Sequence, residues 1–150
     1  SVMAGDGQRL TGLRMVAPVH CAPPDNKPTP AERATCGHWL DRELQLLTTV
    51  ESILVLGSIG WQSLHAAAAR IGWGMPRPRV KFGHGVQTVF TVPGSEGSDS
   101  GGDSDGAGKD GGGGTGARQV RVVGCYHVSQ QNTFTGRLTE AMLDDVIAQL

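Results

Sequence analysis

Short runs of hydrophobic residues alternate with segments of helical periodicity along most of the chain. Three of these runs have the length of buried strands and lie at Leu13–Val19, Ile53–Leu56 and Gln119–Tyr126. Residues 81–85 and 86–92 form a further predicted β-excursion. Because strands that alternate with helices build sheets covered on both faces, we predict an α/β fold, a three-layer α/β/α sandwich with a mostly parallel central sheet.

Helix start signals and apolar faces predict three helices. Thr29 has the features of an N-cap, because a proline follows it at the first helical position and Glu32 completes a capping box. Cys36 therefore lies on this first helix, about one and a half turns from its start. The other two helices are expected over residues 57–71 and 138–150.

Two polar segments follow predicted strands directly. They are CAPPDNKP at residues 21–28 and HVSQQNTFTG at residues 127–136. In a parallel sheet the carboxyl ends of the strands meet at one edge, where α/β proteins bind their ligands. We therefore expect both segments to lie at that edge.

The segment 94–117 interrupts the pattern with glycine, serine and aspartate. It holds 11 glycines, five acidic residues and one basic residue. A stretch this polar can bury almost nothing, and a structureless loop of this length is unusual inside a compact domain. We therefore predict a disordered insertion at 94–117 within a single domain spanning residues 1–150.

Charge and cysteine content narrow the function only slightly. The whole chain has 13 basic and 14 acidic residues. Outside the insertion the net charge is +3, which is compatible with binding to nucleic acid. Three cysteines and no leader-like N-terminus argue against a disulfide framework and favour the cytoplasm. No apolar run is long enough to span a membrane, so we expect no membrane partner.

Two long motifs resemble those of the family 5 (type b) uracil-DNA glycosylases. They are HCAPPDNKPTPAERATC at His20–Cys36 and HVSQQNTFTGRLT at His127–Thr139. Leu54–Gly60 and Pro78–Gly85 are also similar to that family, so the resemblance covers nearly everything outside the insertion. It implies a monomeric enzyme of base-excision repair in a bacterium or archaeon, which flips uracil, and other deaminated bases such as hypoxanthine, out of DNA and releases them hydrolytically.

The resemblance assigns the chemistry to two residues of the polar segments. His127 becomes the catalytic electrophile, which donates to the base as negative charge develops on its O2. Asn26 reads the edge of the flipped base, since an amide both donates and accepts in one plane. Ala17 stands where the related family 4 enzymes have an asparagine that reads uracil, which fits a broader range of bases.

The same motif implies the contacts with DNA. Its polar loop enters the minor groove, and Gln131 holds open the gap that the flipped base leaves in the stack. Arg137 and the hydroxyls of Thr133 and Thr135 are natural partners for phosphates. The DNA-binding residues are thus Ser129, Gln130, Gln131, Asn132, Thr133 and Arg137.

The family pattern also implies a [4Fe–4S] cluster, for which Cys21 and Cys36 are two of the four thiolate ligands. By spacing alone, buried structural cysteines are the favoured interpretation of this pair, and the metal signal is weak. Cys125, at a strand end, is expected in the core. His65 and His84 are likewise expected to be structural.

The chain departs from the family pattern at three places. His20 replaces an arginine, and Val128 replaces a proline whose ring would restrict the loop after His127. The first catalytic motif and two cluster cysteines belong to an N-terminal half that this sequence does not contain. We therefore expect a C-terminal portion, inactive and without a stable cluster by itself. The alternatives are a non-catalytic DNA-binding fragment and a hydrolase with Ser129 as nucleophile, although no G-x-S-x-G elbow surrounds Ser129.

Overall fold

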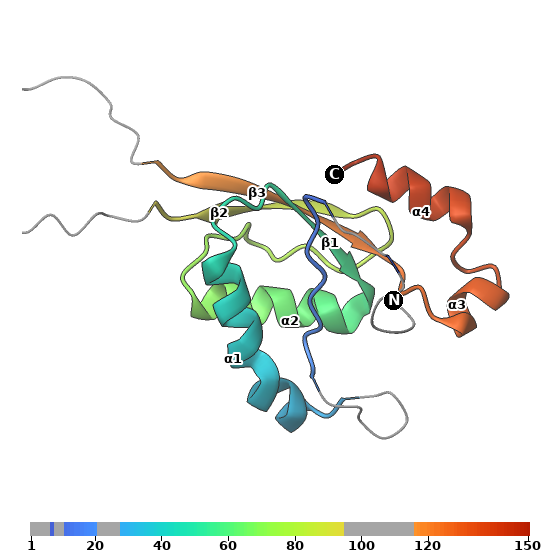
Figure 1. The fold of residues 1–150 in the computed structure, drawn as a ribbon, viewed down its shortest axis with the longest axis horizontal. Helices are drawn as coiled ribbons and strands as arrows, with labels where there is room; N and C mark the ends of the chain where they lie inside the picture. The colour runs from blue at the N-terminus through green and yellow to red at the C-terminus, as the bar shows by residue number, and fades with distance from the viewer. Residues whose placement is uncertain (1–6, 8–10, 21–27, 95–115) are drawn as a thin grey trace, which may run out of the picture.

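The computed structural model describes residue 7 and residues 11–20, 28–94 and 116–150. Strands and helices alternate over most of this chain, with a central sheet and helices on either side of it (Figure 1). In chain order the elements are α1 (Pro30–Leu46), β1 (Ser52–Leu56), α2 (Gly57–Arg70), β2 (Gln87–Val92), β3 (Arg118–Cys125), α3 (Gln130–Phe134) and α4 (Glu140–Ile147).

The sheet is mixed, not mostly parallel. Its strand order is β1-β3-β2, with β1 parallel to β3 and β2 antiparallel to β3. The predicted α/β class is therefore confirmed, and the described part of the sheet is partly parallel, with the predicted β-excursion at 86–92 supplying its antiparallel strand. The reason is local, because β2 and β3 are consecutive strands that pair as a hairpin with Val92 opposite Arg118. Most of the predicted insertion 94–117 connects these two ends and, at residues 95–115, lies outside the described residues.

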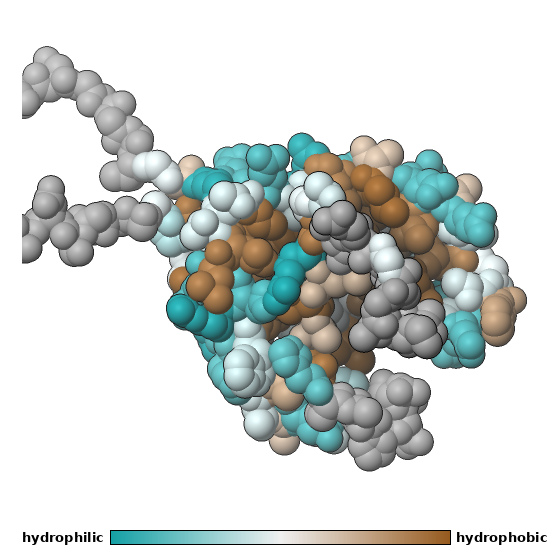
Figure 2. All heavy atoms as spheres, in the orientation of Figure 1, coloured by the Kyte–Doolittle hydropathy of each residue, from teal (hydrophilic) through white to brown (hydrophobic). Residues whose placement is uncertain are grey.

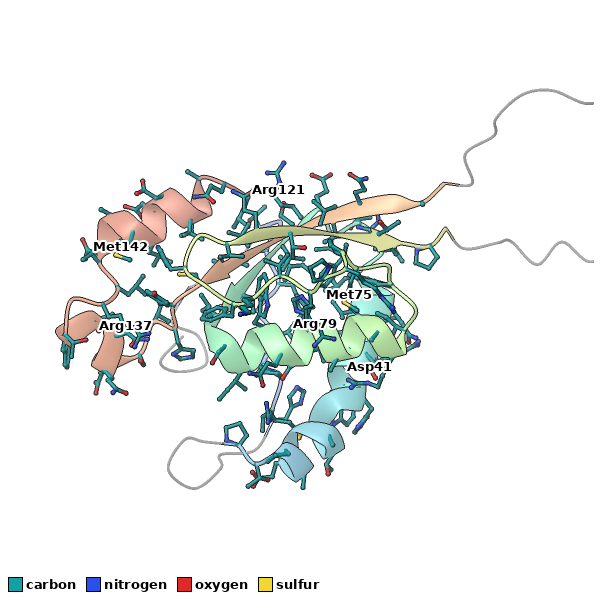
Figure 3. The ribbon with its side chains drawn as sticks, turned by 180° about the vertical axis from the view of Figure 1, so that it is seen from behind. Asp41, Met75, Arg79, Arg121, Arg137 and Met142 are labelled. Carbon is teal, nitrogen blue, oxygen red and sulfur yellow. The ribbon has the colours of Figure 1, made fainter. Side chains whose placement is uncertain are left out.

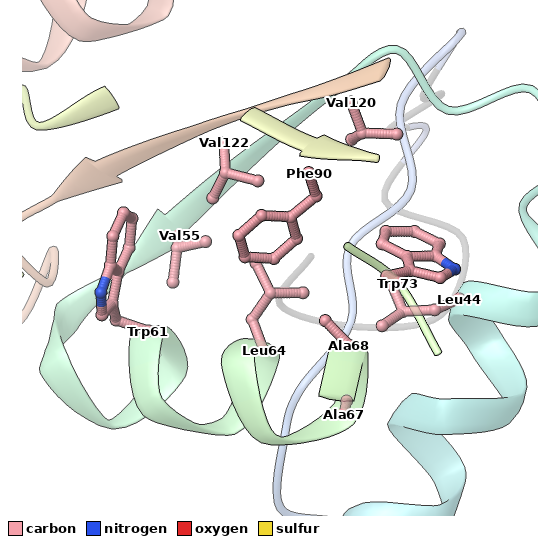
Figure 4. Packing of buried hydrophobic residues seen from close by; sticks show 10 residues of the cluster. All are labelled: Leu44, Val55, Trp61, Leu64, Ala67, Ala68, Trp73, Phe90, Val120 and Val122. Atoms are coloured by element: carbon pink, nitrogen blue, oxygen red, sulfur yellow. The ribbon is translucent and has the colours of Figure 1, made fainter. Parts of the chain in front are cut away.

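Helices cover both faces of the sheet. Successive residues of a strand point to opposite faces, and on β3 Val122 belongs to the hydrophobic cluster beneath α2 whereas Val123 belongs to the cluster beneath α4. Phe90 fills the centre of the first cluster, between the sheet and α2 (Figure 4). Because β3 is buried on both faces, its carboxyl end has a fixed position.

The predicted start of α1 is confirmed in detail. The Glu32 N–H donates to Thr29 Oγ1 at 3.2 Å, and the Thr29 N–H donates to Glu32 Oε2 at 2.7 Å, which completes the capping box. The helix packs against α2, where the Arg70 guanidinium pairs with Asp41 at 2.7 Å. Cys36 lies on this helix, as predicted.

Two predicted strands do not form. Within residues 11–20, which the structure describes, no strand is present, and Leu13 and Met15 are 59% and 63% exposed. A strand needs a neighbour, and none of the described strands pairs with this segment. Residues 81–83 have no regular secondary structure, and His84 and Gly85 form a turn. Among the described residues, no helix combines the length and apolar character that crossing a membrane requires.

Candidate functional site

His127 lies at the edge of the sheet where β1 and β3 both end. β1 passes directly into α2 at Gly57, whose φ of +82° favours glycine. A β-carbon on Gly57 would lie 3.3 Å from the β-carbon of His127. The missing side chain thus lets the segment after β3 cross closely over the junction of β1 and α2, and the His127 side chain remains exposed.

A glycine-rich turn braces the end of β3 from another direction. The Gly85 N–H donates to the Gly124 carbonyl at 2.8 Å, and the Gly124 N–H donates to the Val86 carbonyl at 2.8 Å. A β-carbon on Gly124 would lie 2.7 Å from the carbonyl oxygen of Gly83, too close for any other residue without movement. The turn 83–86 is therefore docked on the last residues of β3, and it carries His84 to the site.

Tyr126 joins this turn to the loop that follows. Its N–H donates to His84 Nδ1 at 3.4 Å, and the two rings are 5.0 Å apart. From beyond α3, the guanidinium of Arg137 lies 4.9 Å from the centroid of the Tyr126 ring. Arg137 extends from the segment between α3 and α4 (Figure 3). Three segments distant in sequence thus meet beside His127.

The predicted polar loop after β3 contains a short helix, α3, which the sequence analysis did not anticipate. The Ser129 carbonyl accepts the N–H groups of Asn132 and Thr133 at 2.9 and 3.0 Å. The Asn132 side chain donates from Nδ2 to the His127 carbonyl at 2.8 Å, and its own carbonyl accepts the Leu138 N–H at 3.0 Å. Asn132 therefore ties α3 to both ends of the loop, and buried Leu138 anchors it to the core.

The structure places the predicted DNA contacts on this loop. Gln130 and Gln131 are exposed on α3, and Arg137 is exposed beyond it. The Thr133 hydroxyl lies 3.2 Å from the Ser129 carbonyl, and the Thr135 hydroxyl donates to the Gln131 carbonyl at 2.6 Å. Each hydroxyl has one hydrogen, so both would have to rotate before donating to a phosphate.

Cys21 and Asn26 lie outside the described residues, so the structure does not relate them to His127. Cys36 is half-buried on α1, with its thiol free. Cys125 is fully buried, and burial raises the pKa of its thiol, which fits the predicted core residue. The donor set therefore fits the predicted assignment of Cys36, and not Cys125, as a soft ligand. No three His, Cys, Asp or Glu side chains gather as a metal site within the described ranges.

His65 is the buried histidine of the fold. It lies on α2 and is 1% exposed, donates from Nδ1 to the Trp61 carbonyl at 2.8 Å, and meets the Phe90 ring edge-on at 5.0 Å. Burial lowers its pKa. A groove of about 310 Å³ between α1 and α2, lined by Arg33 and Arg70 among others, contains none of the predicted site residues.

Sequence reasoning missed two features of the site. His84 was assigned a structural role only, but it contacts Tyr126 next to His127, and the signal was its position between two glycines in a motif shared with the family. Phe134 received no role, although it is 82% exposed at the end of α3. A large apolar residue within an otherwise polar loop was the available signal.

The arrangement suits hydrogen-bond donation to a ligand at the sheet edge. The backbone on either side of His127 is fixed by the Tyr126–His84 and Asn132–His127 hydrogen bonds, while the imidazole itself is open to solvent. A fixed backbone on both sides limits where the ring can lie, and a donor positioned in advance is what the stabilisation of developing charge requires.

Comparison with known proteins agrees with this picture. The profile of the Uracil DNA glycosylase superfamily matches residues 5–150. The chain is 45% identical over 150 residues to the type-5 uracil-DNA glycosylase of Mycobacterium bovis, covering 99% of this chain and 45% of that protein. It is 33% identical over 147 residues to the type-5 uracil-DNA glycosylase of Thermus thermophilus, covering 98% of this chain and 53% of that protein.

The Mycobacterium leprae relative of the same name is 40% identical over 150 residues, with 97% of this chain and 51% of that protein covered. The chain thus spans about half the length of the curated relatives it matches. Because the superfamily match extends over almost all of its residues, the chain belongs to the Uracil DNA glycosylase superfamily.

Proposed function

We propose that the protein carrying this chain is a DNA glycosylase that releases uracil from DNA by hydrolysis in base-excision repair. The observation that carries the proposal is the exposed His127 imidazole, mounted on a backbone that two hydrogen bonds fix at the sheet edge. The printed names of the relatives, type-5 uracil-DNA glycosylase, support the choice of reaction. The catalytic role of His127 follows from that choice.

Breaking the N-glycosidic bond leaves negative charge on the departing base and positive charge on the sugar. A donor beside the base oxygen lowers the barrier because the interaction strengthens as the charge develops. In this proposal the His127 ring N–H supplies that donor. Water then adds to the sugar, so no covalent intermediate with the protein forms.

The reactive base must leave the duplex before it reaches His127. Ser129, Gln130, Gln131 and Asn132 form the segment that approaches the minor groove, and Thr133 and Arg137 contact the phosphates. Support comes from the exposure of Gln130, Gln131 and Arg137 on one loop beside His127. Asn26 is the proposed reader of the base edge, and Ala17 in place of a polar residue favours a range of deaminated bases that includes hypoxanthine.

We further propose that Cys21 and Cys36 are two of the four thiolate ligands of a [4Fe–4S] cluster. The half-buried free thiol of Cys36, on the well-capped helix α1, supports this role. Cys125, in contrast, is buried. When bound, the cluster would supply a structural cross-link between α1 and the segment before it. We place the protein, as a monomer, in the cytoplasm at the nucleoid of a bacterium or archaeon, in keeping with the organisms of its relatives.

Single-turnover excision with His127→Ala tests the proposal. Loss of one donor to a developing oxyanion costs about a hundredfold or more in rate, whereas affinity for uracil-containing DNA should hardly change. His38→Ala is the matched control, because His38 is also an exposed histidine but lies on α1. Excision by His127→Ala within about twofold of the wild type would rule out the catalytic role. Binding of uracil-containing DNA without any release by the wild type would favour a non-catalytic DNA-binding protein.

A further inference from the structure

The most exposed large hydrophobic side chain of the described residues is Phe134. It is 82% exposed at the last position of α3, whereas Leu138, four residues later, is 4% exposed. The end of the molecule that carries α3 is otherwise mostly hydrophilic (Figure 2). A single exposed hydrophobic residue is ordinary on a protein surface, so the place of Phe134, on the loop that begins at His127, is what makes it informative.

Phe134 shares a side of α3 with Gln131. Residues three apart on a helix are neighbours, so the amide of Gln131 and the ring of Phe134 project together. Two hydrogen bonds fix the backbone that carries these side chains. The Asn132 side chain donates to the His127 carbonyl at 2.8 Å, and the Asn132 backbone carbonyl accepts the Leu138 N–H at 3.0 Å. The same hydrogen bonds therefore fix the position of Phe134 relative to His127.

A flipped nucleotide leaves a gap between two stacked neighbours, and the best filling for that gap is flat and apolar. The Gln131 amide can pair with the orphaned partner base, but it is polar and has no aromatic face. The ring of Phe134 has such a face, and every base can stack on it. Arg137, exposed three residues later in the chain with its guanidinium over the Tyr126 ring, is a cation on the same loop for the DNA backbone.

We propose that Phe134 inserts into the base stack of duplex DNA beside the flipped nucleotide, with Gln131 next to it on the orphaned partner base. The inference rests on the proposed function and deepens it, because it names the residue that opens the duplex. Val128, 45% exposed, also lies on this loop but has no aromatic face, whereas Ile147, 48% exposed, lies on α4 and Val89, 41% exposed, lies on β2.

The kinetic test compares substrates in single-turnover excision by the natural protein that contains this chain. Phe134→Ala should slow release from a uracil-containing duplex by about 5- to 150-fold, the range for loss of one base–aromatic stack, and should slow release from single-stranded DNA much less. Phe134→Leu should fall between these values. Ile147→Ala is the matched control and should leave both rates unchanged. Equal losses on the two substrates, or no loss, would overturn the proposal.

A second measurement does not depend on catalysis. In Phe134→Trp the new indole should lose fluorescence when a duplex containing an uncleavable abasic-site analogue binds, because stacking on bases quenches it. The wild type provides the background, since Trp61 and Trp73 are buried and Trp39 is on α1. A new signal that duplex DNA leaves unchanged would overturn the insertion. If the wild type released no uracil from either substrate, the proposed function would fail, and this fluorescence would still decide the insertion.

Discussion

The sheet face beneath α2 and the carboxyl edge of β1 and β3 each contain a histidine and a phenylalanine, in opposite surroundings. Beneath α2, His65 and Phe90 are buried and meet edge-on at 5.0 Å. At the edge, His127 and Phe134 are exposed, and hydrogen bonds fix the backbone that carries them. The same residue types are thus packed into the fold in one region and open to solvent in the other, because the core is held by packing and the edge is held by backbone hydrogen bonds.

Phe90→Ala should show the largest difference between the two regions, because it should lower stability without lowering activity. Removing a fully buried phenylalanine costs about 3–5 kcal/mol, from lost burial and from the cavity left behind. Chemical denaturation should show this loss in the free energy of unfolding. Excision per folded molecule should remain that of the wild type. A variant that is stable but inactive would show that the core face takes part in the reaction.

Gly124→Ala tests the connection between the regions. The new methyl group would lie 2.7 Å from the Gly83 carbonyl oxygen, so the turn carrying His84 must move, at a cost of about 1–3 kcal/mol. We expect a lower melting temperature together with slower excision. Gly116→Ala is the control, because a β-carbon there would meet nothing within 4 Å. Full activity in Gly124→Ala would mean that the turn does not position the site.

The pH dependence of stability should be a property of the core region. Burial lowers the pKa of His65 in the folded state, whereas in the unfolded chain the pKa is about 6.5. Below that pH the unfolded state binds the extra proton, so this contribution is complete above about 6.5 and is lost as pH falls towards the folded pKa, with a slope of at most about 1.4 kcal/mol per pH unit. Unfolding between about pH 7 and about pH 5, a range that brackets the ordinary histidine pKa, should be less pH-dependent in His65→Gln. An unchanged slope would assign the effect to other groups.

The smallest effect is expected from Asn132→Ala at the edge. It removes one hydrogen bond to the His127 carbonyl, worth about 0.5–1.5 kcal/mol. Excision should slow by roughly 2- to 10-fold on single-stranded DNA and by somewhat more on duplex DNA, because Asn132 positions His127 for both substrates and Phe134 for the duplex. The melting temperature should hardly move. Loss on duplex DNA alone would show that Asn132 acts through the DNA-opening face of α3 instead.

Elements with local signals were predictable from the sequence. Thr29 and Glu32 define the start of α1 by their own side chains, and the apolar run of β1 leads directly into α2 at Gly57. The direction of β2 was not predictable, because it depends on pairing with β3 after a long connection. Leu13–Val19 has the composition of a strand but needs a partner strand to become one.

The residues of the candidate site likewise fall into those marked by a local motif and those that only the fold brings together. His127 and the exposed residues around it were found because a long motif marks them in one stretch of sequence. The contact of His84 with Tyr126 spans 42 positions and depends on the close approach of Gly83 to Gly124. Such a contact leaves no local pattern. The helical form of α3, which projects Phe134, likewise depends on hydrogen bonds from Asn132 that no periodicity reveals.

The hairpin of β2 and β3 also determines where a reporter can be attached. Val92 pairs with Arg118 at the start of β3, and the candidate site follows Cys125 at the strand's other end. At about 3.4 Å per residue, a strand of this length separates the two ends by more than 20 Å. A fluorophore or surface tether joined at Pro93 or Ala117, next to this pair, would therefore start from the end of β3 opposite the candidate site. Single-molecule observation of the protein searching along a duplex could begin from that attachment point.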